Sequence, residues 1–71
     1  MDDKNILELK NNIKTLRKKH HMTQQELAEM IGTTRKTIYS VESSEYVPSV
    51  KLAILIATAL DEEFYDVFYL E

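Results

Sequence analysis

The stretch that decides the fold is TQQELAEMIGTTRKTI, residues 23–38. Thr23 and Glu26 have the Thr-x-x-Glu spacing of a capping box, in which each side chain bonds a backbone N–H at the start of a helix. The next residues at helical spacing give this helix a short buried face: Leu27, Ala28 and Ile31. Gly32, the only glycine, takes a positive φ without steric cost, so the helix is predicted to end there.

Another helix is predicted directly after the glycine. Thr34 is placed to cap it, and Ile38 and Val41 lie at a spacing that turns both side chains inward. Two short helices joined by a tight turn of about three residues form a helix-turn-helix, whose second helix fits the major groove of DNA.

All the residues on the outer face of that second helix can form hydrogen bonds: Thr34, Arg35, Lys36, Thr37, Tyr39 and Ser40. Arg35 and Lys36 can reach guanine O6 and N7, a contact that discriminates between bases by about 1–3 kcal/mol. Thr34 or Thr37 can bond a phosphate or touch a thymine methyl group. The alternative is a solvated helix face that carries two ordinary cations.

Before the motif, Leu9, Ile13 and Leu16 recur at helical spacing and predict an amphipathic helix over residues 9–19. Its C-terminal half is basic, which suits the negative end of the helix dipole.

After the motif, Ser49 is placed to cap a helix over residues 50–60. The inner face of this helix is Leu52, Ala53, Ile56, Ala57 and Leu60. Asp61 marks its end, and one or two more helical turns are predicted from Phe64, Val67 and Phe68. A short C-terminal strand over residues 67–70 is predicted to pair with residues 7–10, where Leu7 and Leu9 alternate with polar neighbours.

The length of 71 residues suffices for a single domain, residues 1–71, because so short a chain buries only about 60% of the surface exposed on unfolding. With 44% hydrophobic residues, one glycine and one proline, the composition favours helices. The chain has no cysteine, so neither a disulfide nor a thiolate metal site can stabilise the fold. A small core is therefore expected to gain stability by burying apolar surface against a partner. The longest apolar run, residues 52–60, is shorter than the roughly 20 residues of a membrane span. The polar start lacks the pattern of a signal peptide, so we expect a cytoplasmic protein without a membrane partner.

The formal net charge of −3 is unevenly distributed. Residues 1–23 carry six Lys or Arg against three Asp or Glu, residues 24–60 carry three against four, and residues 61–71 carry none against five. Such a molecule can turn a basic end towards phosphate while its acidic end points away. The alternative is that both ends are simply solvated.

The sequence offers no enzyme or metal site. His20 and His21 are adjacent and the chain has no cysteine, so no set of metal ligands has a suitable spacing. The sequence also lacks a nucleophile framed by glycines, which a hydrolytic triad would require. We therefore predict no catalytic residue, no metal and no cofactor.

Taken together, these blocks resemble the phage-repressor-like helix-turn-helix regulators of the Cro and Xre type, which belong to prokaryotes and phages. The resemblance covers about residues 12–68 and rests on blocks in the expected order: residues 13–17, 22–28 and 31–38, Glu42, residues 46–49 and residues 52–53. It implies an all-α, compact five-helix repressor-like domain with the helix-turn-helix in its second and third helices. It also implies a regulator of transcription that binds double-stranded DNA as a repressor.

The resemblance implies roles for individual residues. In similar proteins the glutamine that opens the second helix holds a DNA phosphate, and here that residue is Gln24. The residues expected to face the bases are Thr34, Arg35, Lys36, Tyr39 and Ser40. The residues expected to contact phosphate are Gln24, Thr23, Arg17, Thr37 and Tyr46. The alternative for Arg17 is a structural ion pair with Glu42, and the alternative for Tyr46 is packing of its ring over the loop.

The sequence departs from the family's pattern after Glu42. Relatives usually place a basic residue, a glycine and another basic residue there, which this chain replaces by Ser43, Ser44 and Glu45. Relatives also tend to have lysine at the position of Ser40, glycine at that of Asp61 and glutamine at that of Lys36. A lysine favours guanine or phosphate over adenine, and Asp61 predicts a different end for the preceding helix.

The C-terminal end is unusually apolar for so small a protein, and a second copy of the chain would cover it. Residues 61–71 are predicted to form a dimerisation element, with an interface made of Leu55, Phe64, Tyr65, Phe68, Tyr69 and Leu70. A two-fold dimer sets two recognition helices about 34–36 Å apart, so that an inverted-repeat operator is read. The alternative for the aromatic end is ordinary closure of the core. The alternative function is that of an antitoxin or protein-binding regulator, in which an unidentified partner protein is the primary target.

Overall fold

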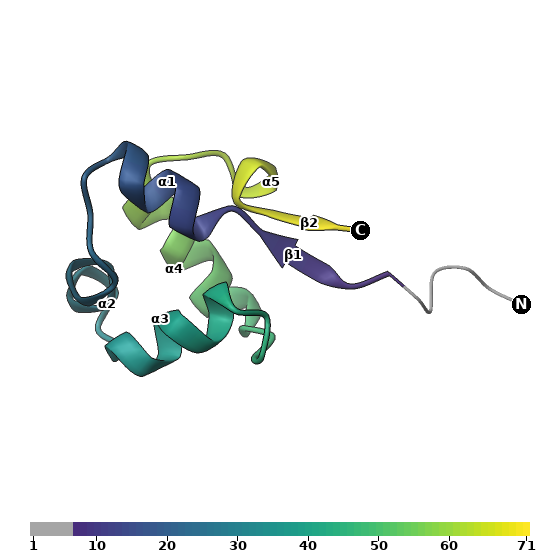
Figure 1. Ribbon diagram of the computed structural model, residues 1–71, viewed down its shortest axis with the longest axis horizontal. Helices are drawn as coiled ribbons and strands as arrows, with labels where there is room; N and C mark the ends of the chain where they lie inside the picture. Colours follow the sequence, from purple (N-terminus) through teal and green to yellow (C-terminus); the bar gives the residue numbers. More distant parts are fainter. Residues whose placement is uncertain (1–6) are drawn as a thin grey trace, which may run out of the picture.

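Short helices and two strands make up the computed structural model, which describes residues 7–71 (Figure 1). In chain order the elements are β1 (Leu9–Asn11), α1 (Ile13–Lys19), α2 (Gln24–Ile31), α3 (Arg35–Glu42), α4 (Val50–Leu60), α5 (Phe64–Val67) and β2 (Phe68–Leu70). The predicted all-helical architecture, with a short C-terminal strand, is confirmed. Within residues 7–71, no helix has the length and apolar character that crossing a membrane requires.

The three middle helices begin at the predicted caps. Thr23 Oγ1 accepts from the Glu26 N–H at 3.0 Å, and the Thr23 N–H donates to the Glu26 carboxylate at 2.8 Å, which completes the predicted capping box. Thr34 caps α3 and Ser49 caps α4 through the same kind of side-chain bond. Gly32 ends α2 in the left-handed conformation, with a φ of 73°.

The first helix starts later than predicted. Leu9 belongs to β1, so the prediction of a helix from residue 9 was wrong. Two asparagines turn the chain into α1: Asn11 Oδ1 accepts from the Ile13 N–H at 3.1 Å, and the Asn12 N–H donates to the Val67 carbonyl at 2.9 Å. The second bond ties the chain to the junction of α5 and β2. In a helix that began at residue 9, the Asn12 N–H would instead have found its acceptor within the helix.

β1 and β2 pair with each other, as predicted, and run antiparallel. β1 begins two residues later and ends one residue later than the predicted range 7–10, and β2 begins one residue later than the predicted range 67–70. Leu9 faces Leu70, Lys10 faces Tyr69 and Asn11 faces Phe68. Figure 1 shows this pair as an arm that extends away from the helices.

The core lies where α4 packs among the other helices (Figure 1). Its buried residues are Ile13, Leu27, Ala28, Ile38, Val41, Ala53, Ile56, Ala57, Leu60, Val67 and Phe68. These include most of the residues predicted on the inner faces of the helices, while Leu16, Ile31 and Leu52 pack partly buried at its edge. The core therefore fixes the orientation of α3, the helix that carries the candidate site.

Helix α4 ends at the position where relatives tend to have glycine. Asp61 takes the left-handed conformation there, with φ 55° and ψ 45°, and its N–H donates to the Thr58 carbonyl at 3.0 Å. The predicted difference at this end is therefore absent: the aspartate adopts the backbone that a glycine would adopt.

Replacing Asp61 by glycine should stabilise the protein by about 0.5–1 kcal/mol. The left-handed backbone is costly for a residue with a Cβ, and glycine removes this cost. We expect the free energy gained in the folded state to exceed the entropy that glycine adds to the unfolded chain. The midpoint of thermal unfolding measures the change. Asp61→Asn is the matched control, because it removes the charge but keeps the Cβ. If only Asp61→Asn stabilised the protein, charge rather than backbone strain would be the cause.

Candidate nucleic-acid interface

The two faces of α3 differ as the sequence predicted. Ile38 and Val41 are buried, with 0% and 2% of their surface exposed. On the outer side, Thr34, Arg35, Lys36 and Tyr39 are exposed and Ser40 is half-buried. The helix therefore offers a continuous row of hydrogen-bonding side chains to a ligand that approaches from outside.

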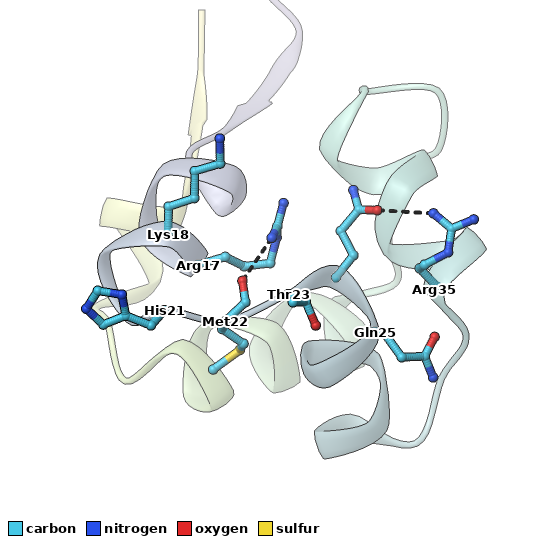
Figure 2. Close-up of a pocket in the computed structure, with 8 residues that line it drawn as sticks. Arg17, Lys18, His21, Met22, Thr23, Gln25 and Arg35 are labelled. Atoms are coloured by element: carbon cyan, nitrogen blue, oxygen red, sulfur yellow. Dashed lines mark hydrogen bonds between the residues drawn. The ribbon is translucent and has the colours of Figure 1, made fainter.

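A shallow hollow lies beside this row, between the end of α1 and the start of α2 (Figure 2). Its lining is Arg17, Lys18, His21, Met22, Thr23, Gln24, Gln25 and Arg35. Three of these side chains are cations and none is acidic. The first backbone N–H groups of a helix also favour an anion. The hollow thus has the charge and the donors that a phosphate group requires.

A second hollow lies on the opposite side of α3. Its lining is Thr33, Lys36, Thr37, Ser40, Tyr46 and Leu52. Tyr46, a predicted phosphate contact, is 47% exposed and lines this hollow together with Lys36. The outer face of α3 is therefore flanked on both sides by a hollow that contains a cation.

The ion pair considered for Arg17 is present. Arg17 Nε donates to Glu42 Oε2, and Arg17 Nη2 donates to Glu42 Oε1 at 3.1 Å. The remaining nitrogen, Nη1, donates to the Met22 carbonyl at 2.9 Å. Each side chain of the pair is only 8% exposed. The pair ties α1 to the end of α3, and at its rim Arg17 also lines the first hollow.

Gln24 connects this ion pair to the outer face. Its Nε2 donates to Glu42 Oε1 at 3.1 Å, which orients the amide so that Oε1 accepts from Arg35 Nη1 at 3.4 Å. Figure 2 shows Arg35 held by this bond at the edge of the hollow. A predicted phosphate contact and a predicted base contact are therefore joined directly.

Two of the three threonines among the predicted contacts, Thr23 and Thr34, cap helix starts. Thr34 Oγ1 accepts from the Thr37 N–H at 3.2 Å and lies 3.1 Å from Thr37 Oγ1. Thr23 holds Glu26, and the Thr23 backbone N–H, with its hydroxyl, keeps the pKa of that carboxyl below its ordinary value. These caps fix where each hydroxyl lies relative to the outer face of α3.

One basic residue of α1 is turned away from the hollows. Lys19 Nζ and His20 Nε2 lie 2.9 and 2.8 Å from Glu62 Oε2. The hydrogen bond from Lys19, followed by that from His20, holds the pKa of Glu62 below its ordinary value. The basic and acidic ends of the chain therefore meet at this point, and Lys19 adds no charge to the lining of either hollow.

The residues predicted for a dimer interface lie in different environments. Tyr65 is 84% exposed and Leu70 is 64% exposed. Phe64 and Tyr69 are each 36% exposed, and Leu55 is half-buried. Phe68 lies in the core with 2% of its surface exposed, because it begins β2 and its side chain turns inward.

The sequence analysis gave no site role to four residues that line the first hollow: Lys18, His21, Met22 and Gln25. The basic end of α1 was a usable signal for Lys18. His21 lies in a left-handed turn, with a φ of 55°, which no sequence pattern indicated.

A family model described as helix-turn-helix matches residues 13–67. The chain is 41% identical over 63 residues to the uncharacterized HTH-type transcriptional regulator YgzD of Bacillus subtilis, which covers 89% of this chain and 96% of YgzD. It is 40% identical, with the same coverage, to an uncharacterized HTH-type transcriptional regulator of Methanocaldococcus jannaschii.

Solved structures are similar over most of the fold. The restriction-modification controller protein C.AhdI from Aeromonas hydrophila superposes with a TM-score of 0.72 at 30% identity, over 76% of this chain and 78% of that protein. A Bacteroides fragilis protein superposes with a TM-score of 0.78 at 24% identity, over 86% of this chain and 98% of that protein, which indicates a shared fold.

Proposed function

The chain belongs to the helix-turn-helix family of DNA-binding transcriptional regulators, and from this premise we propose that it is a dimeric repressor that reads an inverted-repeat operator. Its function is binding rather than catalysis. The observation that most supports the proposal is the hydrogen-bonding outer face of α3 between two cation-lined hollows. In the major groove, base edges lie between two phosphate backbones, so this arrangement matches both kinds of contact at once.

Base recognition is proposed for the outer face of α3. Arg35 has the donors for guanine O6 and N7, and Lys36, Tyr39, Ser40 and Thr34 extend the same row. Phosphate binding is proposed for the first hollow, through Gln24, Thr23 and the added residues Lys18 and His21, and for the second hollow, through Thr37 and Tyr46. Arg17 acts mainly by position, because the ion pair with Glu42 holds Gln24 in place.

A homodimer completes the proposal. The exposed side chains of Tyr65 and Leu70 would lose contact with water against a second copy, which favours association. Residues 61–71 would then serve as the dimerisation element and set the two recognition helices about one helical turn of DNA apart.

Selection of bound sequences from a random duplex pool tests the function, at about 150 mM salt so that non-specific charge effects stay near their physiological size. The expected result is an enriched inverted repeat with half-sites one turn apart. Folded protein that enriches no sequence would contradict the proposal.

Arg35→Ala should reduce discrimination at one base pair of each half-site by about 1–3 kcal/mol, while affinity for random DNA falls much less. Lys18→Ala is the matched control, because Lys18 is a cation of the same hollow that is proposed to contact phosphate and not a base. It should weaken binding to all sequences alike and reduce the salt slope by about one. Titration of selected and random duplexes at several salt concentrations measures both. Equal losses on both duplexes for both variants would refute this division of roles.

A second candidate function is protein binding, with an antitoxin as one form of it. The observation that favours it is a groove between α4 and α5, lined by Val50, Ile54, Phe64 and Tyr65 and rimmed by Glu62 and Glu63. Salt separates the two functions, because DNA affinity falls steeply with salt and an apolar protein interface changes little.

A further inference from the structure

The arm has a free strand edge. Glu8 and Glu71 exchange both backbone hydrogen bonds at 3.0 Å, so the next pair, Leu9 with Leu70, exchanges none. The N–H and C=O of Leu9 consequently point to the side of β1 away from β2. Figure 1 shows no helix beside the outer end of this edge among the described residues.

The two faces of the arm have opposite character. Leu9, Phe68 and Leu70 share the face that continues the core, because paired residues and those two apart along a strand lie on one side. At the outer end this face is uncovered: Leu70 is 64% exposed and Leu7 is 47% exposed. The other face carries Glu8, Lys10, Tyr69 and Glu71. A half-covered apolar face next to a free edge is typical of a sheet that continues in another chain.

We propose that the free edge of β1 pairs antiparallel with β1 of a second copy, with the two-fold axis at Leu9. This inference rests on the proposed function, since it takes the repressor to be a dimer. It moves the two-fold axis to β1, so that of residues 61–71 only β2 enters the shared sheet, and Tyr65 on α5 lies outside it. In this register the two Leu9 residues exchange backbone bonds, and Glu8 of each copy lies opposite Lys10 of the other. Such non-bonded pairs bring side chains close, with Cα atoms about 4.5 Å apart.

Charge supports this register over pairing with an unrelated strand. Within one copy, Glu8 and Glu71 lie opposite each other on the polar face, and Lys10 Nζ contacts Glu8 Oε1 at 3.1 Å. Lys10 of the second copy brings a further cation to these two carboxylates. The resulting four-stranded sheet also gathers Leu7, Leu9 and Leu70 of both copies on one face.

The free edge of β2 suits self-pairing less well. The Phe68 N–H already donates to the Phe64 carbonyl, where it ends α5. A two-fold axis at Leu70 would set Tyr69 opposite Glu71 and would form no ion pair. The complementary charges therefore select β1.

Charge exchange tests the pairing, with dimer dissociation constants of the full chain measured by sedimentation equilibrium. Glu8→Lys and Lys10→Glu should each raise the constant about tenfold, because two cross-copy ion pairs become like-charge pairs. The double variant Glu8→Lys/Lys10→Glu should return to within about threefold of wild type. A mixture of the two single variants should associate more tightly than either alone, and circular dichroism confirms that each variant is folded.

Two results would overturn the pairing. One is a wild-type chain that stays monomeric; the other is a dimer whose constant is unchanged in all the charge variants. In the second case, dissociation by Tyr65→Ser would place the interface on α5 instead. The test is separate from that of function: a selected inverted repeat with unaffected charge variants would retain the repressor and reject the β1 pairing. If the charge variants changed the dimer dissociation constant as expected but no DNA sequence were selected, the β1 pairing would be retained and the repressor function rejected.

Discussion

Replacing Glu42 by alanine should lower the free energy of unfolding by about 3–5 kcal/mol, because it leaves the buried guanidinium of Arg17 without its counter-charge. Both side chains of the pair are 8% exposed, and Glu42 accepts two bonds from Arg17 and one from Gln24. A small domain has a total stability of about 5–15 kcal/mol, so much of the protein would unfold at moderate urea concentrations. Urea titration followed by circular dichroism measures the loss.

Matched variants separate the charge from the packing. Glu42→Gln keeps the size of the side chain and one acceptor oxygen, so it should cost less than Glu42→Ala. The double variant Arg17→Met/Glu42→Leu removes both charges and fills similar volume, so it should recover much of the stability lost in Glu42→Ala. A single alanine variant that costs less than about 1 kcal/mol would show that water reaches the pair and screens it.

The same pair connects folding to recognition. Glu42 orients the amide of Gln24, which in turn accepts from Arg35 on the outer face of α3. A Glu42→Gln protein should therefore be less stable to unfolding. Under conditions where it remains folded, it should also discriminate less between DNA sequences. The site and the core share this residue, so no variant of Glu42 is a purely structural one.

The local part of the fold could be predicted because its determinants are close together in the sequence. Each cap, such as Thr23, Thr34 or Ser49, bonds a backbone group three residues away, and Gly32 ends its helix through its own backbone. The outer face of α3 follows from helical spacing once its inner face is known. These features need no knowledge of the tertiary structure.

The remaining features depend on contacts between distant residues. Leu9 fits a helix with Ile13 by spacing and also fits a strand by alternation, and the bond from Asn12 to Val67 decides for the strand. Arg17 and Glu42 are 25 residues apart, so both a phosphate contact and an ion pair were open to Arg17. Tertiary geometry settles such choices, and single-sequence patterns do not contain it.

Phe68 shows how one backbone change moves a side chain from the surface to the core. Phe64 and Phe68 are four residues apart and would share one face of a continuous helix. The helix ends at Val67, however, and β2 begins at Phe68 with extended backbone, φ −121° and ψ 138°. The ring therefore packs inward, 5.4 Å from the Phe64 ring, while Phe64 remains at the surface.

Phe68→Ala should accordingly lower the free energy of unfolding by about 3–5 kcal/mol, the usual cost of removing a buried phenyl ring. Tyr69→Ala is the matched control, because its ring is exposed on the opposite face of the arm, and it should cost less than about 1 kcal/mol. Urea titration compares the two variants at a protein concentration well below the dimer dissociation constant. If Phe68→Ala weakened association but left the monomer stable, the ring would belong to the dimer interface rather than to the core.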